Sequence, residues 1–330
     1  MLKIIVDCMG GDNGAKVIVT AIKNFLKSNK EVEVAAVGKK EELAELENIC
    51  RIIDARDVVP MTAGALDVLR MKDSSMMVAL KTMRDEHYDA IVSCGSTGGF
   101  LASATITLKM IPGIKRAALV SAIPCQEKGK FMTLLDCGAN NENTAEELVQ
   151  FALMGRLYAQ AVLNNKDPKT YLLSNGSEDE KGSPEVKEAN KLLRASNFPN
   201  FQGNIEGREA VLDPNVDVVV TGGFAGNCYL KGIEGTAKLM GNLIKSAFSM
   251  NLSTKIGYLF AKKGVASIKE NMDYKAVGGA LLLGINGAVV KAHGNSDEKS
   301  FYSAMMLAKK IGESKAVEKI KEGVESGNIK

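Results

Sequence analysis

The sequence contains no tryptophan, and all aromatic residues together make up only 5% of its 330 residues. Proteins that bind single-stranded nucleic acid stack the bases on aromatic side chains, so this composition counts against that class. The formal net charge of +3 is too small to indicate nucleic acid by itself. We therefore expect no nucleic-acid partner.

None of the six cysteines forms a C-x-x-C pair, so the usual signature of a structural zinc site is missing. The opening residues do not resemble a signal peptide, and no apolar run reaches the roughly eighteen residues of a membrane-spanning helix. We expect a reducing, cytosolic setting with free thiols. Any contact with a membrane is then peripheral.

Short β-branched runs alternate with helical stretches along most of the chain. Such alternation favours a parallel sheet that helices cover on both faces. We expect strands at residues 3–7, 32–37, 52–54, 89–93, 117–123, 133–136, 170–173 and 217–221. We expect helices at residues 15–26, 74–84 and 145–163, and surface helices in the tail at 297–329.

Glycine-rich or polar turns follow four of these strands. Ligands bind beyond the carboxyl ends of the strands in parallel sheets, so we expect the four turns to gather at one edge of the sheet. Backbone N–H groups in such turns attract anions, which predicts a phosphorylated or anionic substrate. Neither G-x-G-x-x-G at a helix start nor a P-loop is present, so a nucleotide site is poorly supported. The turns are Asp7–Asp12, Ser93–Gly98, Asp136–Asn140 and Gly222–Asn227.

Some side chains near these turns invite a chemical interpretation. His293 lies beside glycine and small polar residues, where it can protonate a leaving group or serve as a hydrogen-bonded structural residue. Cys94 can accept an acyl group, but a structural thiol fits better because no histidine adjoins it in the sequence. Asp7, Asp12 and Asp136 can bind a metal or brace their turns. We favour the brace and expect no metal.

Residues 231–271 break the alternation, because they are helical with little strand signal and are interrupted at 251–253. They predict a helical hairpin that projects from a single α/β domain spanning residues 1–330. Lysines flank its apolar residues, and three interpretations stay open: contact with an anionic membrane, contact with an acidic protein, or packing at a dimer interface. The apolar residues are Leu239, Leu243, Ile244, Phe248, Met250, Leu252, Ile256, Leu259 and Phe260, and the lysines are Lys238, Lys245, Lys255, Lys262, Lys263 and Lys269.

Seven motifs, in order from residue 3 to about residue 305, resemble the PlsX family of phosphate acyltransferases. They are DCMGGD at 7–12, KDSSM at 72–76, SCGSTG at 93–98, LDCGAN at 135–140, GNIEG at 203–207, GFAGN at 223–227 and KAHG at 291–294. The corresponding family motifs are D-A-M-G-G-D, K-D-S-S-M, S-A-G-N-T-G, L-D-x-G-A-N, G-N-x-E-G, G-F-T-G-N and K-A-H-G. The chain departs from the family pattern at Ser96, Gly222 and Val277, where the family has asparagine, aspartate and tyrosine.

The resemblance implies a three-layer α/β/α fold with a mostly parallel sheet, similar to isopropylmalate dehydrogenases and phosphotransacetylases, in a homodimer. It implies transfer of a fatty acyl group from acyl carrier protein to inorganic phosphate for phospholipid synthesis, and membrane contact through the hairpin from the cytoplasm. We expect no cofactor. We expect His293, Asn227 and Lys181 to be catalytic. We expect Gly10, Gly11, Asp12, Ser96, Thr97, Gly98, Asp136, Gly138, Asn140, Asn204, Glu206, Gly223 and Phe224 to bind substrate.

Two other functions stay open on the sequence alone. The three departures are compatible with a related transacylase that uses acyl-CoA or a short acyl thioester. They are also compatible with a catalytically weak homologue that acts as a membrane-associated binding protein. Phosphate-dependent turnover, compared between the two donors, separates these possibilities.

Overall fold

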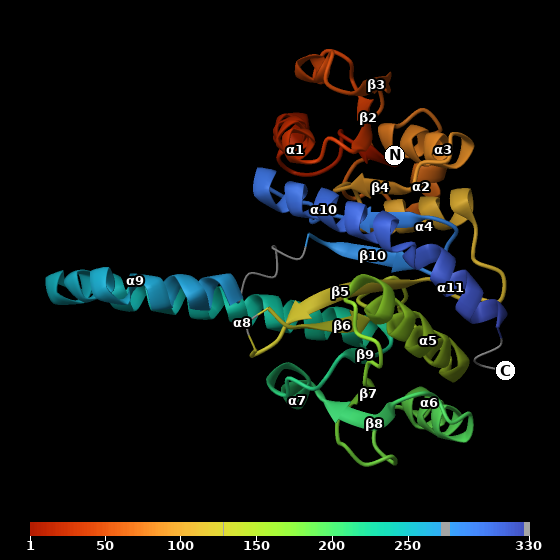
Figure 1. The fold of residues 1–330 in the computed structure, drawn as a ribbon, viewed down its shortest axis with the longest axis vertical. Coiled ribbons are helices and arrows are strands. Elements are labelled where there is room, and N and C mark those ends of the chain that lie inside the picture. Colours follow the sequence, from red (N-terminus) through yellow and green to blue (C-terminus); the bar gives the residue numbers. More distant parts are fainter. Residues whose placement is uncertain (128, 272–277, 327–330) are drawn as a thin grey trace.

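A computed structural model describes residues 1–127, 129–271 and 278–326 of the chain, and its strands form one sheet between two layers of helices (Figure 1). The sheet has eleven strands in the order β3-β2-β1-β4-β11-β10-β5-β6-β9-β7-β8. The predicted three-layer α/β/α fold is therefore confirmed. The strands are β1 (Leu2–Asp7), β2 (Val32–Gly38), β3 (Arg51–Asp54), β4 (Ala90–Ser93), β5 (Ala118–Pro124), β6 (Phe131–Leu135), β7 (Thr170–Ser174), β8 (Phe201–Glu206), β9 (Val218–Val220), β10 (Ala280–Leu283) and β11 (Ala288–Lys291).

The helices cover the sheet in two sets, each with its own apolar core. The α helices are α1 (Gly14–Ser28), α2 (Ala65–Arg70), α3 (Ser75–Asp85), α4 (Thr97–Leu108), α5 (Ala145–Val162), α6 (Pro184–Ala195), α7 (Gly207–Leu212), α8 (Gly223–Ser249), α9 (Leu252–Asn271), α10 (Glu298–Ser314) and α11 (Ala316–Glu325). One core joins the sheet to α1, α5, α6, α10 and α11. The other core joins it to α3, α4, α7 and the first turns of α8. Because both faces are covered, strands such as β4 and β9 are buried along their whole length.

The direction of the strands changes inside the sheet. β1, β4 and β11 are parallel to one another. β10 is antiparallel to β11 and to β5, and β5 is in turn antiparallel to β6. β6, β9, β7 and β8 are again parallel to one another. These four strands therefore run opposite to β1, β4 and β11.

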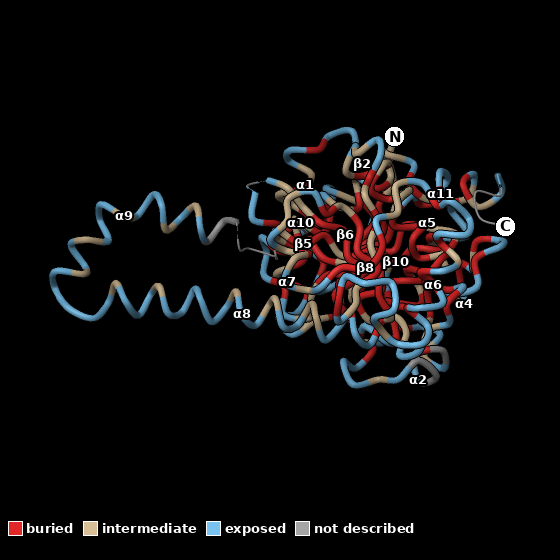
Figure 2. Tube along the Cα trace, turned by 90° about the horizontal axis from the view of Figure 1, so that it is seen from below, coloured by how far each residue is buried: buried red, intermediate tan, exposed pale blue. Residues whose placement is uncertain are grey.

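The helix that follows β9 is longer than the sequence suggests. α8 begins at Gly223, eight residues before the predicted start of the hairpin, so the motif at 223–227 lies in its first two turns. α8 and α9 run side by side and project from the body as a helical hairpin (Figure 2). Elements α2, α4, α6, α7, β8, β10 and β11 also lack a specific sequence prediction. Among the described helices, none combines the length and apolar composition that crossing a bilayer requires.

Candidate active site

Three turns meet at the carboxyl ends of β1, β4 and β11, which we call the first edge. A Cβ atom on Gly10 would lie 2.5 Å from the Cα atom of Gly95, so the turns after β1 and β4 touch through their backbones. The amide of Asp12 donates to the carbonyl of Gly294 at 2.8 Å, which links the turn after β11. The first edge therefore collects the predicted residues Gly10, Gly11, Asp12, Ser96, Thr97, Gly98 and His293.

Lys291, the last residue of β11, is buried at the first edge, and its ammonium group donates to the carbonyl of Ala292. Burial lowers the pKa of Lys291 to about 8, against the opposing effect of the charges on Cys94, Asp7 and Asp12. Near neutral pH the side chain is therefore a largely protonated cation with few competing water contacts. Such a group attracts anions strongly.

The free energy of unfolding should depend on Lys291 in alkaline solution. An unfolded lysine keeps its proton up to a pKa of about 10.4, so between about pH 8 and 10.4 the unfolded state binds more protons and the contribution of Lys291 to stability rises with pH. We expect the unfolding free energy of the wild type minus that of Lys291→Met to increase by about 2–3 kcal/mol from about pH 7.5 to about pH 10.5. Denaturant unfolding at both pH values measures it. A pH-independent difference would show that Lys291 titrates normally.

A second group of turns meets at the carboxyl ends of β6 and β9, part of what we call the second edge. A Cβ atom on Gly223 would lie 2.1 Å from the carbonyl oxygen of Asn140, and one on Gly226 would lie 1.9 Å from that of Asp136. Only glycine permits these approaches, so the start of α8 packs directly on the turn after β6. The second edge collects the predicted residues Asp136, Gly138, Asn140, Gly223, Phe224 and Asn227.

Buried aspartates brace the turns at both edges. Asp7 accepts hydrogen bonds from the hydroxyl groups of Ser75 and Ser93, each at 2.7 Å. Asp136 is fully buried and accepts from four backbone amides and from the Asn140 side chain, at 2.7–3.0 Å. Both oxygens of Asp136 are thus occupied by protein donors. Among the described residues, no three or more histidine, cysteine, aspartate or glutamate side chains are grouped as metal ligands.

The prediction that all four turns gather at one edge is wrong. β6 and β9 run antiparallel to β1, β4 and β11, so their carboxyl ends lie at the opposite edge of the sheet. The cause is the antiparallel pairing of β10 and β5 with their neighbours, which reverses the direction of β6, β9, β7 and β8 relative to β1, β4 and β11. The turns after β1 and β4 are therefore separated from the turns after β6 and β9 by the length of the strands.

α8 connects the two edges, because it starts at the second edge and runs back along the sheet. A Cβ atom on Gly138 would lie 3.2 Å from the side chain of Asn227, in the second turn of α8. Lys231, one turn further, lies close enough for its charge to act on the pKa values of Cys137 and Lys291. Asn227 and Lys231 thus form a row on α8, which we call the α8 row, between the two groups of turns.

Neither lysine of this arrangement has a role predicted from the sequence, where Lys291 is part of the KAHG motif and Lys231 is the predicted start of the hairpin. The four-residue spacing of Asn227 and Lys231 was the available signal, because it puts both on one face of a helix. Lys231 also pairs with Glu234 at 2.6 Å, which holds its ammonium group near the helix.

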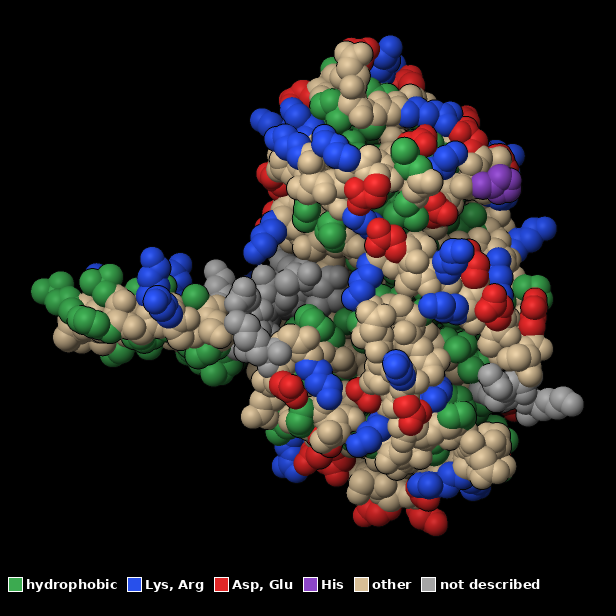
Figure 3. Space-filling model, viewed as in Figure 1, with side chains coloured by type: hydrophobic (Ala, Val, Ile, Leu, Met, Phe, Trp, Pro, Cys, Tyr) green, Lys and Arg blue, Asp and Glu red, His purple; other side chains and the backbone are tan. Residues whose placement is uncertain are grey.

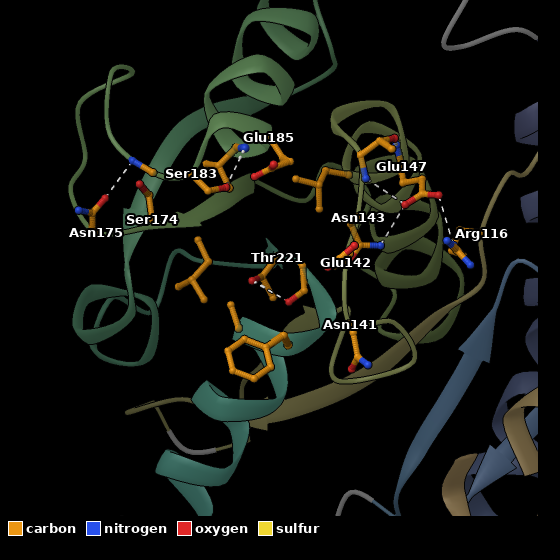
Figure 4. Close-up of a pocket in the computed structure, with 18 residues that line it drawn as sticks. Arg116, Asn141, Glu142, Asn143, Glu147, Ser174, Asn175, Ser183, Glu185 and Thr221 are labelled. Atoms are coloured by element: carbon orange, nitrogen blue, oxygen red, sulfur yellow. Dashed lines mark hydrogen bonds and ion pairs between the residues drawn. The ribbon is translucent and has the colours of Figure 1, made fainter. Parts of the chain in front are cut away.

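A separate cavity of about 960 Å³ lies where α5, α6 and α8 begin (Figure 4). Asn143 extends into this region from the loop before α5, and its Oδ1 accepts the amide of Gly223 at 3.0 Å. Ser174 lines the cavity, and its hydroxyl oxygen is buried with no hydrogen-bond partner in the described part of the chain. Arg116 and Glu147 form an ion pair of 3.3 Å at the cavity wall. The polar groups suit a ligand that carries its own donors and acceptors.

The remaining predicted residues lie beside this cavity, around β7 and β8. Asn204 is buried on β8, and its side-chain amide donates to the carbonyls of Glu178 at 2.7 Å and Lys181 at 3.3 Å. Asn204 therefore holds the loop between β7 and α6 in place. Lys181 is exposed on that loop next to Gly182, which lines the cavity, and Glu206 is exposed at the end of β8. The structure thus separates Lys181 from His293.

Comparison with known proteins identifies the family. A family model described as "Fatty acid synthesis protein" matches residues 2–319. The phosphate acyltransferase of Clostridium novyi is 39% identical over 336 residues, which cover 99% of this chain and 100% of the relative. The chain belongs to the phosphate acyltransferase family. The corresponding protein of Staphylococcus aureus is 36% identical over 334 residues, covering 99% of this chain and 100% of the relative.

Solved structures agree with this family in their fold. A phosphotransacetylase from Streptococcus pyogenes superimposes with a TM-score of 0.61 at 18% identity, covering 96% of this chain and 94% of its own. A branched-chain phosphotransacylase from Enterococcus faecalis gives 0.60 at 14% identity, covering 94% and 99%. The predicted family, fold class and enzyme class of phosphate acyltransferase are thus confirmed. The binding-protein alternative is correspondingly less well supported.

Two of the departures from the family motifs have local explanations in this phosphate acyltransferase. Ser96 caps α4, because its hydroxyl accepts the amide of Gly99 at 3.4 Å and donates to the carbonyl of Ala63 at 3.1 Å. At Gly222 the family aspartate is missing, and Asn143 supplies the acceptor at the start of α8. The third departure, Val277, lies outside the described residues.

Proposed function

We propose that this enzyme transfers a fatty acyl group from acyl carrier protein to inorganic phosphate, which binds between the α8 row and Lys291. The observation that carries the proposal is that the charge of Lys231, one helical turn after Asn227 on α8, acts on the buried ammonium group of Lys291. A phosphate dianion leaves water only where charges and N–H donors replace its hydration. α4 also begins at the first edge, where Lys291 lies, and the positive end of the α4 dipole favours an anion.

The proposed reaction is a direct transfer. A phosphate oxygen attacks the thioester carbonyl, the C–S bond breaks, and the carrier thiolate leaves and takes a proton. In this proposal Asn227 donates to the oxyanion of the tetrahedral intermediate, and His293 at the first edge is the acid. The structure offers little support for a covalent path through Cys94. Its thiol donates to the carbonyl of Gly10 at 3.0 Å, and burial raises its pKa to about 12.

The donor is tested directly by incubating the purified enzyme with palmitoyl-ACP and phosphate and following the free carrier thiol and acyl phosphate. Parallel samples omit phosphate or contain palmitoyl-CoA instead. We expect thiol release from the carrier that requires phosphate. Release from CoA but not from the carrier would replace this proposal by the acyl-CoA transacylase. No release from either donor by folded protein would reject the proposed reaction.

We propose that the cavity at the start of α5, α6 and α8 binds the polar arm by which acyl carrier protein carries its acyl group. Ser174 lines this cavity with its hydroxyl oxygen buried, so a larger side chain at this position would crowd the arm. Ser174→Leu should raise the KM for palmitoyl-ACP about tenfold through this crowding and leave the KM for phosphate unchanged. Ser196→Leu is the matched control, because that serine caps the end of α6. Equal changes in both KM values would contradict a donor site.

We propose that the hairpin contacts an anionic membrane surface from the cytoplasm, and homodimer formation remains a prediction. Leu252, Leu259 and Phe260 are 74%, 70% and 87% exposed around its tip. Large apolar side chains this exposed mark a contact surface when they occur together. Lysines lie on the hairpin beside this apolar tip (Figure 3). This combination fits a peripheral contact with acidic lipid.

Binding to lipid vesicles tests the proposed contact between the hairpin and an anionic membrane. Leu259→Ser combined with Phe260→Ser should weaken binding to vesicles that contain phosphatidylglycerol by at least about tenfold, because each side chain loses burial of about 1.5–3 kcal/mol. Ile106→Ser, at a residue that is 58% exposed on α4, is the matched control. Sedimentation with vesicles gives both affinities. Unchanged binding of the double variant would assign another role to the hairpin.

A further inference from the structure

Two adjoining cavities lie on the face of the sheet that α5 and α10 cover, away from α8. The first has a volume of about 530 Å³, within the usual range of about 300–1,000 Å³ for ligand pockets. Its wall is mainly apolar, with aliphatic side chains from both helices. Ala122, Phe131, Val162, Leu163, Met306 and Leu307 line it.

The second cavity, of about 280 Å³, shares Phe131, Leu163 and Lys310 with the first. Its other lining residues include the polar side chains of Lys130, Asn165 and Asp217. The carboxylate of Asp217 accepts the amide of Lys169 at 2.9 Å, so part of its charge is already compensated. The two cavities together therefore have an apolar end and an end with two lysines.

The lysines at this site differ in their partners. Lys309 pairs with Glu31 and lies 3.7 Å from Glu313. Lys310, between the two cavities, forms no ion pair within the described part of the chain. An anionic head group can thus meet Lys310 without displacing an existing partner.

We propose that the two cavities form one binding site for a long-chain fatty acid, with its chain in the apolar cavity and its carboxylate at Lys310 and Lys130. The site is separate from the α8 row, because α5 and α10 cover the opposite face of the sheet. It gives the enzyme a means to sense free acyl chains without occupying the reaction site. The proposal does not depend on how the α8 row binds phosphate.

The start of β10 packs against the wall of the apolar cavity. Ser303 of α10 lines this cavity, and a Cβ atom on Gly278, two residues before β10, would lie 2.3 Å from the carbonyl of Ser303.

Calorimetric titration of the full chain with palmitate, below the concentration at which palmitate aggregates, tests the proposal. We expect binding that weakens roughly tenfold for every two carbons removed from the chain. Lys310→Glu and Met306→Asp, both at exposed positions, should each weaken palmitate binding at least tenfold. The matched control Lys319→Glu, on the exposed side of α11, should bind as the wild type does.

Three results would overturn the site. Wild-type affinity in both Lys310→Glu and Met306→Asp would show that palmitate binds elsewhere or not at all. Loss of binding in Asn227→Ala would place palmitate at the reaction site instead. If the two variants bind palmitate as the wild type does but sediment with a different molecular mass, the face of α5 and α10 is instead a contact between two copies of the chain. Melting temperatures of all variants identify any that fail to fold.

Discussion

Asn227→Ala should lower kcat for acyl transfer to phosphate by about 10²-fold or more, the usual cost of removing one donor to an oxyanion. The side chain is exposed in the second turn of α8 and makes no hydrogen bond within the described part of the chain, so stability should change little. His293→Ala should lower kcat about tenfold, because a thiolate leaving group needs little acid assistance. Steady-state rates with palmitoyl-ACP and phosphate measure both effects.

The control for this pair is Cys228→Ala, which changes the exposed neighbour of Asn227 on α8. It should retain the wild-type rate. Full activity of Asn227→Ala would remove the α8 row from the mechanism. Full activity of Asn227→Ala together with a severe loss in His293→Ala would move the reaction to the first edge alone.

Gly226→Ala should destabilise the fold by about 3 kcal/mol or more, as expected for severe overpacking in a buried position. The added Cβ atom would lie 1.9 Å from the carbonyl oxygen of Asp136, and neither backbone can move freely. The start of α8 must then shift away from the turn after β6. Because Asn227 is the next residue, activity should fall together with stability. Denaturant unfolding and steady-state rates check the two effects.

Gly241→Ala is the matched control on the same helix. Nothing lies within 4 Å of a Cβ atom at Gly241. The substitution should stabilise the helix by about 0.5–1 kcal/mol, because alanine has less conformational freedom to lose than glycine. Equal stability of the Gly226 and Gly241 variants would show that α8 can withdraw from the turn without cost.

The sequence predicts the strands well because their apolar runs are local signals. β1, β4 and β9 are buried on both faces, and each matches a short β-branched run. The start of α8 is different, because glycines at 222, 223 and 226 are typical of a turn. Those glycines serve close packing of the helix on a neighbouring turn, and that contact partner is distant in the sequence. Local propensity therefore misplaces the helix start.

The division of the site between two edges also depends on contacts that are distant in the sequence. Each βα unit correctly predicts a turn at the carboxyl end of its own strand. The insertion of β10 between β11 and β5 then decides which way the second half of the sheet runs. Likewise, the lowered pKa of Lys291 arises from burial by several elements, so its role cannot be seen in the KAHG motif alone.

α8 is one unbroken helix from the site to the end of the hairpin. Ser249, its last residue, follows Asn227 by 22 positions, which corresponds to a rise of about 33 Å. A continuous helix of this length is stiff. Its first turns carry Asn227 and Lys231, and its far end lies at the apolar tip of the hairpin. A force that displaces the tip is therefore transmitted along the helix to Asn227 and Lys231. The positions of these two side chains then depend on whether the tip is held in place.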